Sequence, residues 1–177
     1  MPDLNEEQRK ALMEKLKNMS PEELREFQKK QCIFCQIVSG KVEAKKVYED
    51  DKVLAILDIN PANKGHTLLM PKEHVAIMPQ LSDEDIKYLS KMTKRISHAT
   101  LKALKCEGTT TFVANGLVAG QRAQHFMIHI IPRNKGDVVG LAIPQKEISE
   151  DDIKLLRETI QNKISQMFGI KKEVVVE

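Results

Sequence analysis

The sequence predicts an α+β fold in which an antiparallel sheet carries one long inserted helix, with a helical extension before it and another helix after it. Short apolar runs separated by turn residues fill the middle of the 177-residue chain and indicate strands. One long helical pattern interrupts these runs, and shorter helical patterns stand at both ends. A doubly wound parallel sheet would instead require strands and helices in regular alternation.

Three segments of the chain differ in pattern. Residues 1–30 are rich in Glu, Lys, Gln and Leu and predict two short helices, the second starting at Pro21 behind the cap residue Ser20. A short helical pair cannot bury an apolar stripe alone, so we expect it to pack on the main domain or on a second subunit. Residues 31–140 form the main domain, and residues 141–177 are a C-terminal helical segment with a tail.

Five short runs predict the strands of the main domain. They are bounded by turn residues such as Asp50-Asp51 and Pro71, and the first two runs form a hairpin. The expected strands cover Val47–Glu49, Val53–Leu57, His66–Met70, Thr109–Ala114 and His125–Ile131.

Two further helices have clear end signals. Ser82 caps a long helix that has one apolar face and ends near Lys105. A last helix begins after Ser149 and ends at Phe168 before a glycine. The tail residues Val174–Val176 are expected to add an edge strand or to fray.

Composition and charge limit the classes of protein to which this chain can belong. The 28 basic and 25 acidic residues give a net charge of only +3, which does not favour a nucleic-acid partner. No apolar segment approaches the roughly 20 residues that span a bilayer, and Glu6 and Glu7 interrupt any apolar leader. We therefore expect a cytoplasmic protein with no membrane partner. Three cysteines in that setting do not indicate a disulfide framework.

Cysteine and histidine residues suggest a metal site. Cys32 and Cys35 form a Cys-x-x-Cys pair in an expected hairpin-like turn, and His74 and His125 could complete a tetrahedral zinc set. A site closed by four protein ligands would stabilise the fold and would not catalyse. The redox alternative is weaker, since a thioredoxin-like pair should precede a helix.

The run from Gln124 to Pro132 bears most directly on function. Alternate residues of a strand share a face, so His125, Met127 and His129 should point to one side. An imidazole can act as nucleophile, base or metal ligand, whereas a thioether cannot take or give a proton. Just upstream, the glycine-containing loop Ala119–Arg122 could hold an anion through backbone N–H groups, Gln121 and Arg122.

These segments together resemble the histidine triad (HIT) family, particularly its Hint-like branch of nucleotide-binding phosphoramidases and dinucleoside polyphosphate hydrolases. The resemblance covers about residues 32–140, and the order and spacing of the motifs agree throughout. The matching segments are Cys32–Val38, Leu54–Pro61, Gly65–His74, Ala119–Gln121 and His125–Arg133.

The resemblance implies an α+β homodimer in which each protomer holds a purine nucleoside monophosphate or dinucleotide against the sheet. It implies that Asp58 holds the ribose hydroxyls and that His66 sits beside the phosphate. It also strengthens the zinc hypothesis, because some bacterial members carry the same metal set. The implied phosphate contacts are Gln121, Arg122 and His129, of which His129 and Gln121 would support catalysis. The implied base pocket is Phe34, Ile37, Ile56, Ile59 and Leu68.

The chain departs from the family pattern at the decisive position. The family's middle histidine attacks the α-phosphorus and forms a covalent nucleotidyl-histidine, and Met127 stands there in this chain. The family's Asn-x-Gly has also become Ala114-Asn115-Gly116. We therefore expect a nucleotide-binding protein whose covalent catalysis is lost or altered. The alternatives are a hydrolase that uses another mechanism, an engineered His-to-Met variant, or an interaction protein with a vestigial pocket.

Overall fold

The computed structural model describes residues 5–140 and 144–169. The chain divides into two compact units, Met1–Val139 and Gly140–Glu177, which are considered separately. The expected tail strand at 174–176 lies outside the described residues. No helix within the described ranges is long and apolar enough to cross a membrane.

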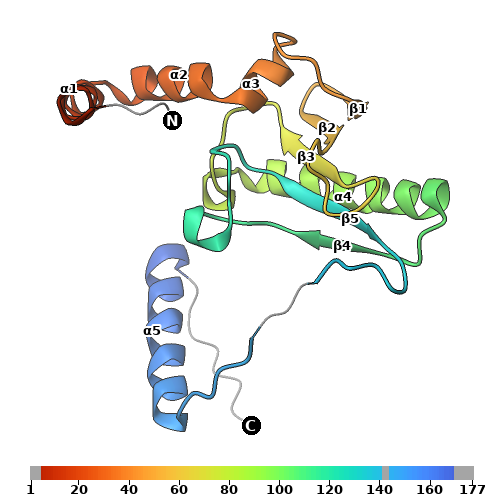
Figure 1. Ribbon diagram of the computed structural model, residues 1–177. Coiled ribbons are helices and arrows are strands. Elements are labelled where there is room, and N and C mark those ends of the chain that lie inside the picture. The colour runs from red at the N-terminus through yellow and green to blue at the C-terminus, as the bar shows by residue number, and fades with distance from the viewer. Residues whose placement is uncertain (1–4, 141–143, 170–177) are drawn as a thin grey trace. The chain divides into compact units, whose positions relative to one another are not determined.

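The first unit contains four α-helices and five strands among its described residues (Figure 1). The helices are α1 (Glu6–Lys17), α2 (Pro21–Gln31), α3 (Ile33–Val38) and α4 (Asp83–Leu104). The strands are β1 (Lys46–Glu49), β2 (Val53–Leu57), β3 (Thr67–Pro71), β4 (Gly108–Phe112) and β5 (Ile128–Arg133). Two single-turn 3₁₀ helices cover Met78–Gln80 and Leu117–Ala119.

The strands form one sheet in the order β1-β2-β3-β5-β4, and every neighbouring pair is antiparallel. The long helix α4 separates β3 from β4 in sequence, although β5 lies between those two strands in the sheet. The α+β fold expected from the sequence is thus confirmed. Ser82 caps α4 as expected, because its side chain accepts a hydrogen bond from the Asp85 amide.

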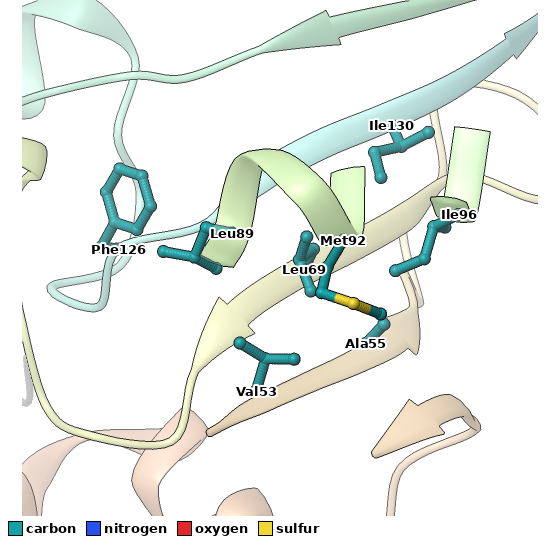
Figure 2. Close-up of a cluster of buried hydrophobic side chains, with 8 residues drawn as sticks. All are labelled: Val53, Ala55, Leu69, Leu89, Met92, Ile96, Phe126 and Ile130. Carbon is teal, nitrogen blue, oxygen red and sulfur yellow. The ribbon is translucent and has the colours of Figure 1, made fainter. Parts of the chain in front are cut away.

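Helix α4 covers one face of the sheet. Leu89, Met92 and Ile96 recur at helical spacing, so they lie on the same side of α4 and are all buried. Figure 2 shows them directed toward the strand residues of this cluster. Those strand residues are Val53, Ala55, Leu69 and Ile130, with Phe126 just before β5.

The opposite face carries a second apolar cluster. The two-residue period of a strand sends Leu54, Ile56, Leu68 and Met70 away from α4, where they meet Ile37 of α3. Phe34 and Met127 pack against this group. The short helix α3 therefore lies over the sheet face that α4 leaves uncovered.

The N-terminal helices have strong end signals but no buried residues. Asn5 caps α1 and Ser20 caps α2, and both form capping boxes with a residue three positions on. Neither helix buries a side chain in this single chain. That α1 and α2 pack on the main domain or on a second subunit stays a prediction.

Several local expectations were wrong. Strand β3 begins at Thr67 and not at His66, and β4 ends at Phe112 and not at Ala114. The ladder of the last strand begins at Ile128, not at His125, because the Phe126 amide donates to the Val75 carbonyl at 2.6 Å, outside the ladder. The Cys-x-x-Cys pair does not lie in a hairpin-like turn: Cys32 is the N-cap of α3, and Cys35 lies within that helix. Three apolar residues among Ile33–Val38 pack on the sheet, and this tertiary burial favours a helical turn there.

The second unit contains helix α5 (Glu150–Phe168). Ser149 caps it through the Asp152 amide, and Gly169 ends it in the left-handed conformation at φ 64°. Both ends agree with the sequence prediction.

Candidate functional site

The candidate site lies on the sheet face opposite α4. Even-numbered residues of β2 and β3 face this side, and so do odd-numbered residues of β5. Residues that are direct partners on neighbouring strands point to the same face of the sheet. His66 and Asp58 continue the even-numbered positions beyond the strand ends, and His129 pairs with Leu68 in the ladder. The strand alternation thus brings residues far apart in sequence to one surface.

Two thiols and two imidazoles meet at one edge of this face. Cys35 Sγ lies 3.1 Å from His74 Nδ1 and 3.6 Å from His125 Nδ1, and Cys32 Sγ lies 3.5 Å from His125 Nδ1. All four potential ligand atoms lie within 4.8 Å of one another. Helix α3 supplies the thiols, and the loops after β3 and before β5 supply the histidines.

This donor set fits a tetrahedral metal ion. Sulfur and nitrogen ligands bound to one zinc ion would lie about 3.6 Å apart, close to the separations found here. His125 Nε2 donates to the Pro71 carbonyl at 2.9 Å, which leaves the Nδ1 lone pair directed at the thiols. Burial, together with nearby His74, lowers the pKa of His125 to about 4, so the ring is neutral and able to ligate.

The same cluster does not suit a reactive thiol. Burial and the neighbouring Cys32 raise the pKa of the Cys35 thiol to about 12, whereas redox-active cysteines have a lowered pKa. Burial also lowers the pKa of His74, and Lys29 contributes to that shift.

A second cluster contains Asp58, His66 and His129. His66 Nε2 lies 3.0 Å from His129 Nδ1, and His66 Nδ1 lies 3.4 Å from Asp58 Oδ2. His66 is buried, while His129 and Asp58 are half-buried. The three side chains form a line through both nitrogens of the central imidazole.

Burial shapes the protonation of this second cluster. It lowers the pKa of His129 to about 4, with His66 acting in the same direction and Asp58 opposing it. Burial also lowers the pKa of His66, against the pull of Asp58. Both rings are therefore neutral near pH 7 and share one proton between Nε2 of His66 and Nδ1 of His129.

Met127 lies between the two clusters in sequence and joins the apolar group on this face. Its thioether offers only a weak acceptor and no transferable proton. The alternation that placed His125, Met127 and His129 on one side of the sheet holds, although only His129 lies within the β5 ladder.

The structure brings some of the other expected nucleotide contacts together and leaves others apart. Phe34, Ile37, Ile56 and Leu68 belong to one apolar cluster with Met127, whereas Ile59 is 90% exposed. Arg122 is exposed in the loop before β5. The side-chain amide of Gln121 donates from Nε2 to the Ala76 carbonyl at 2.6 Å, and its Oε1 accepts from the Gly116 backbone amide at 2.7 Å. The Gln121 side chain therefore connects two loops.

The sequence did not point to Phe112 as a residue next to His129, and it gave no partner for Asn115. Phe112 stacks on His129, and Asn115 accepts a hydrogen bond from the Met78 amide at 2.9 Å. The pairing of Phe112 with His129 follows from the β4–β5 register, which the sequence does not give. One feature of the sequence could have indicated Phe112: it lies in the strand expected just before the strand that carries His129.

Comparison with known proteins identifies the fold family of this arrangement. The HIT domain matches residues 39–136, which is more than half of the chain. A HIT-like protein of Methanocaldococcus jannaschii is 47% identical over 106 residues, covering 60% of this chain and 81% of that protein. The adenosine 5′-monophosphoramidase of Schizosaccharomyces pombe is 40% identical over 134 residues, covering 75% of this chain and 98% of that enzyme.

One of the similar solved structures is of a zinc-bound protein. The zinc-bound histidine triad family protein of Mycobacterium smegmatis superposes with a TM-score of 0.61 at 32% identity. The match covers 78% of this chain and 99% of that one.

Proposed function

Because this chain belongs to the histidine triad (HIT) family, we propose that it binds a purine nucleoside monophosphate, or a dinucleotide containing one, on the sheet face opposite α4. The observation that carries the proposal is the juxtaposition of an apolar cluster with the polar Asp58–His66–His129 group. An apolar surface suits a base, and a few convergent polar groups suit ribose and phosphate. The relative from Schizosaccharomyces pombe, an adenosine 5′-monophosphoramidase, supports adenosine as the nucleoside.

We further propose that covalent catalysis is lost or altered in this chain, because Met127 occupies the position of the attacking histidine. Removing a nucleophile from a covalent mechanism costs on the order of 10⁴ to 10⁶ in rate, or about 5 to 8 kcal/mol of barrier stabilisation. His129 and Gln121 would then play supporting roles only. For Gln121 this requires release of its bonds to Ala76 and Gly116.

Titration calorimetry and turnover together test this function. AMP and GMP titrated into the full chain should release or absorb heat, and no heat with either nucleotide at millimolar concentration would refute nucleotide binding. Hydrolysis of adenosine phosphoramidate and diadenosine polyphosphates should be slow for the natural chain and much faster for Met127→His. Equal and robust rates for both would show that the missing histidine is not what limits turnover.

We also propose a structural zinc ion held by Cys32, Cys35, His74 and His125. The separations of their donor atoms and the Pro71 contact behind His125 support it, and the zinc-bound relative supports the identity of the metal. With all four positions filled by protein ligands, the ion would tie α3 to the loops around β3 and β5 and supply no reacting water.

The assembly that we propose is a homodimer in the cytoplasm. An apolar groove of about 640 Å³ runs along the C-terminal half of α4, bounded by β1–β3, on the far side of the sheet from the nucleotide face. Groove residues such as Val47, Leu57 and Leu104 are exposed in the single chain and would be covered by a second copy. Light scattering on the eluted peak of a sizing column should give twice the mass of the chain, and a monomer at micromolar concentration would refute the dimer.

A further inference from the structure

The Asp58–His66–His129 line offers a route to hydrolysis that does not use the missing nucleophile. We propose that these three residues form a proton relay through which His129 Nε2 acts as general base for a water molecule that attacks the α-phosphorus. The inference rests on the nucleotide binding proposed above. His129 is the catalytic residue in this scheme, and His66 and Asp58 are positioning residues.

The geometry of His66 favours a relay over a metal chelate. Its Nδ1 faces Asp58 and its Nε2 faces His129, and the two nitrogens of an imidazole point in divergent directions. One ligand atom from each of the three side chains does lie within 4.8 Å of the others, but the shortest contacts use both nitrogens of His66, one toward each partner. A proton can instead pass through the ring, entering at one nitrogen as another leaves at the other.

Asp58 sets the tautomer that the relay needs. His66 Nδ1 lies 3.4 Å from the Asp58 carboxylate and 3.2 Å from the Ala62 amide, so an acceptor and a donor compete for the same nitrogen. The hydrogen bond present is the one from the Ala62 amide, so the relay requires that the negative charge of Asp58, which favours a protonated His66, draws the proton to Nδ1 in place of that donor. His66 Nε2 then accepts from His129 Nδ1–H, and His129 Nε2 keeps a free lone pair.

The surroundings hold His129 in this orientation and keep it neutral. Its ring stacks on Phe112 with centroids 4.3 Å apart and planes 6° apart. Burial lowers its pKa to about 4, so its lone pair is available at neutral pH. His66 is buried, which protects the internal proton path from bulk water.

The step balances with a phosphoramidate substrate. The water oxygen forms the new P–O bond while its proton moves to His129 Nε2, and the Nδ1 proton of His129 moves to His66 Nε2. Asp58 stabilises the resulting His66 imidazolium. The P–N bond breaks with its electron pair on nitrogen, and that nitrogen takes a proton from solvent water on the opposite side of phosphorus. The protons then move back along the relay, and His129 Nε2 releases one to solvent. AMP and ammonia leave, and the three side chains return to their starting state.

The matched test uses Asp58→Asn, His66→Gln and His129→Gln in the full chain, with His98→Gln as control. His98 is an exposed residue of α4, outside both clusters. General-base catalysis contributes about 10²- to 10⁴-fold, so kcat for adenosine phosphoramidate should fall by about that factor in the first three variants. The factor by which kcat falls should exceed the factor by which AMP affinity falls in calorimetry, because the relay acts on the attacking water, and His98→Gln should match the unaltered chain.

A second readout separates the relay from a ribose contact of Asp58. If Asp58 only holds the ribose, Asp58→Asn will raise KM and leave kcat unchanged, and a 2′,3′-dideoxy substrate will erase the difference between the two proteins. The relay predicts a loss of kcat that persists with the dideoxy substrate. Nitrogen NMR of the histidine rings should also find His129 Nε2 unprotonated in the natural chain and protonated in Asp58→Asn.

Each outcome decides between the two proposals. AMP binding without any turnover by the natural chain would overturn the relay and leave nucleotide binding standing. Absence of AMP binding would overturn both. A nucleotidyl adduct found by mass spectrometry after acid or base quench, or an unchanged kcat in Asp58→Asn, would overturn attack by water through the relay.

Discussion

The imidazole of His129 lies flat against the phenyl ring of Phe112, with ring centroids 4.3 Å apart and planes inclined by only 6°. The two residues are direct partners in the β4–β5 ladder, so the sheet register fixes the contact. One face of the catalytic candidate is thereby covered by an aromatic ring from the edge strand. This stacking should stabilise both the sheet edge and the orientation of His129.

Replacing Phe112 by Leu should destabilise the fold by about 0.5–1.5 kcal/mol, because an aromatic pair contributes roughly that much beyond its buried area. Urea denaturation of the natural chain and the variant measures the difference. Phe168→Leu is the matched control, since Phe168 is 66% exposed at the end of α5. Similar losses in the two variants would show that the stacking contributes nothing specific.

Cys35→Ser should abolish the bound zinc that we propose and lower the melting temperature. The remaining three ligands cannot close a tetrahedral site, and structural zinc sites contribute directly to folding. Elemental analysis should find about one zinc per chain in the natural protein and in Cys106→Ser, whose thiol lies outside the cluster. A natural protein purified without metal, or an equal zinc content in Cys35→Ser, would rule out the site.

The Asp50 carboxylate should make the free energy of unfolding depend on pH in the acidic range. Burial opposes its ionisation, but hydrogen bonds from Tyr88, Val53, Lys52 and Tyr48 outweigh that effect and lower the pKa of Asp50 to about 2. A carboxyl whose folded pKa lies below its unfolded value stabilises the fold above the unfolded pKa, near 3.8, and loses that effect as pH falls toward 2.

The measurement is the free energy of unfolding of the natural chain and of Asp50→Asn across acidic pH. The natural chain should be more stable near pH 7, and the gap between the two should narrow as pH falls through about 4 toward 2. A gap that stays constant over that range would contradict the assignment. Tyr88→Phe, which removes the 2.7 Å hydrogen bond, should raise the pKa of Asp50 and lower the free energy of unfolding at neutral pH.

Gly65→Ala should destabilise the chain more than Gly136→Ala does. Both glycines have positive φ, at 85° and 80°, so both variants incur the strain of a left-handed residue. A methyl group at Gly65 would also collide with the Leu104 side chain and crowd Pro132, whereas the space beside Gly136 is open. The difference in melting temperature between Gly65→Ala and Gly136→Ala measures the effect of the collision with Leu104. Equal melting temperatures would show that Leu104 moves aside without loss of stability.

The helices were predictable because their signals are local. Ser20, Ser82 and Ser149 each cap a helix through an amide three residues on, and that interaction needs no tertiary context. The exception is α3, the six-residue helix after Cys32. It is too short to form by propensity and depends on packing against the sheet.

The sequence by itself determined which residue types could carry chemistry and which of them share a face, because strand alternation and motif spacing are properties of the chain. It placed Met127 where a nucleophile would stand. Only the tertiary structure decided the partners: His66 and His129 meet across 63 positions of sequence, Gln121 bonds to Ala76, and Phe112 covers His129. These contacts depend on strand register and loop course, which many residues set together through packing, so no local pattern encodes them.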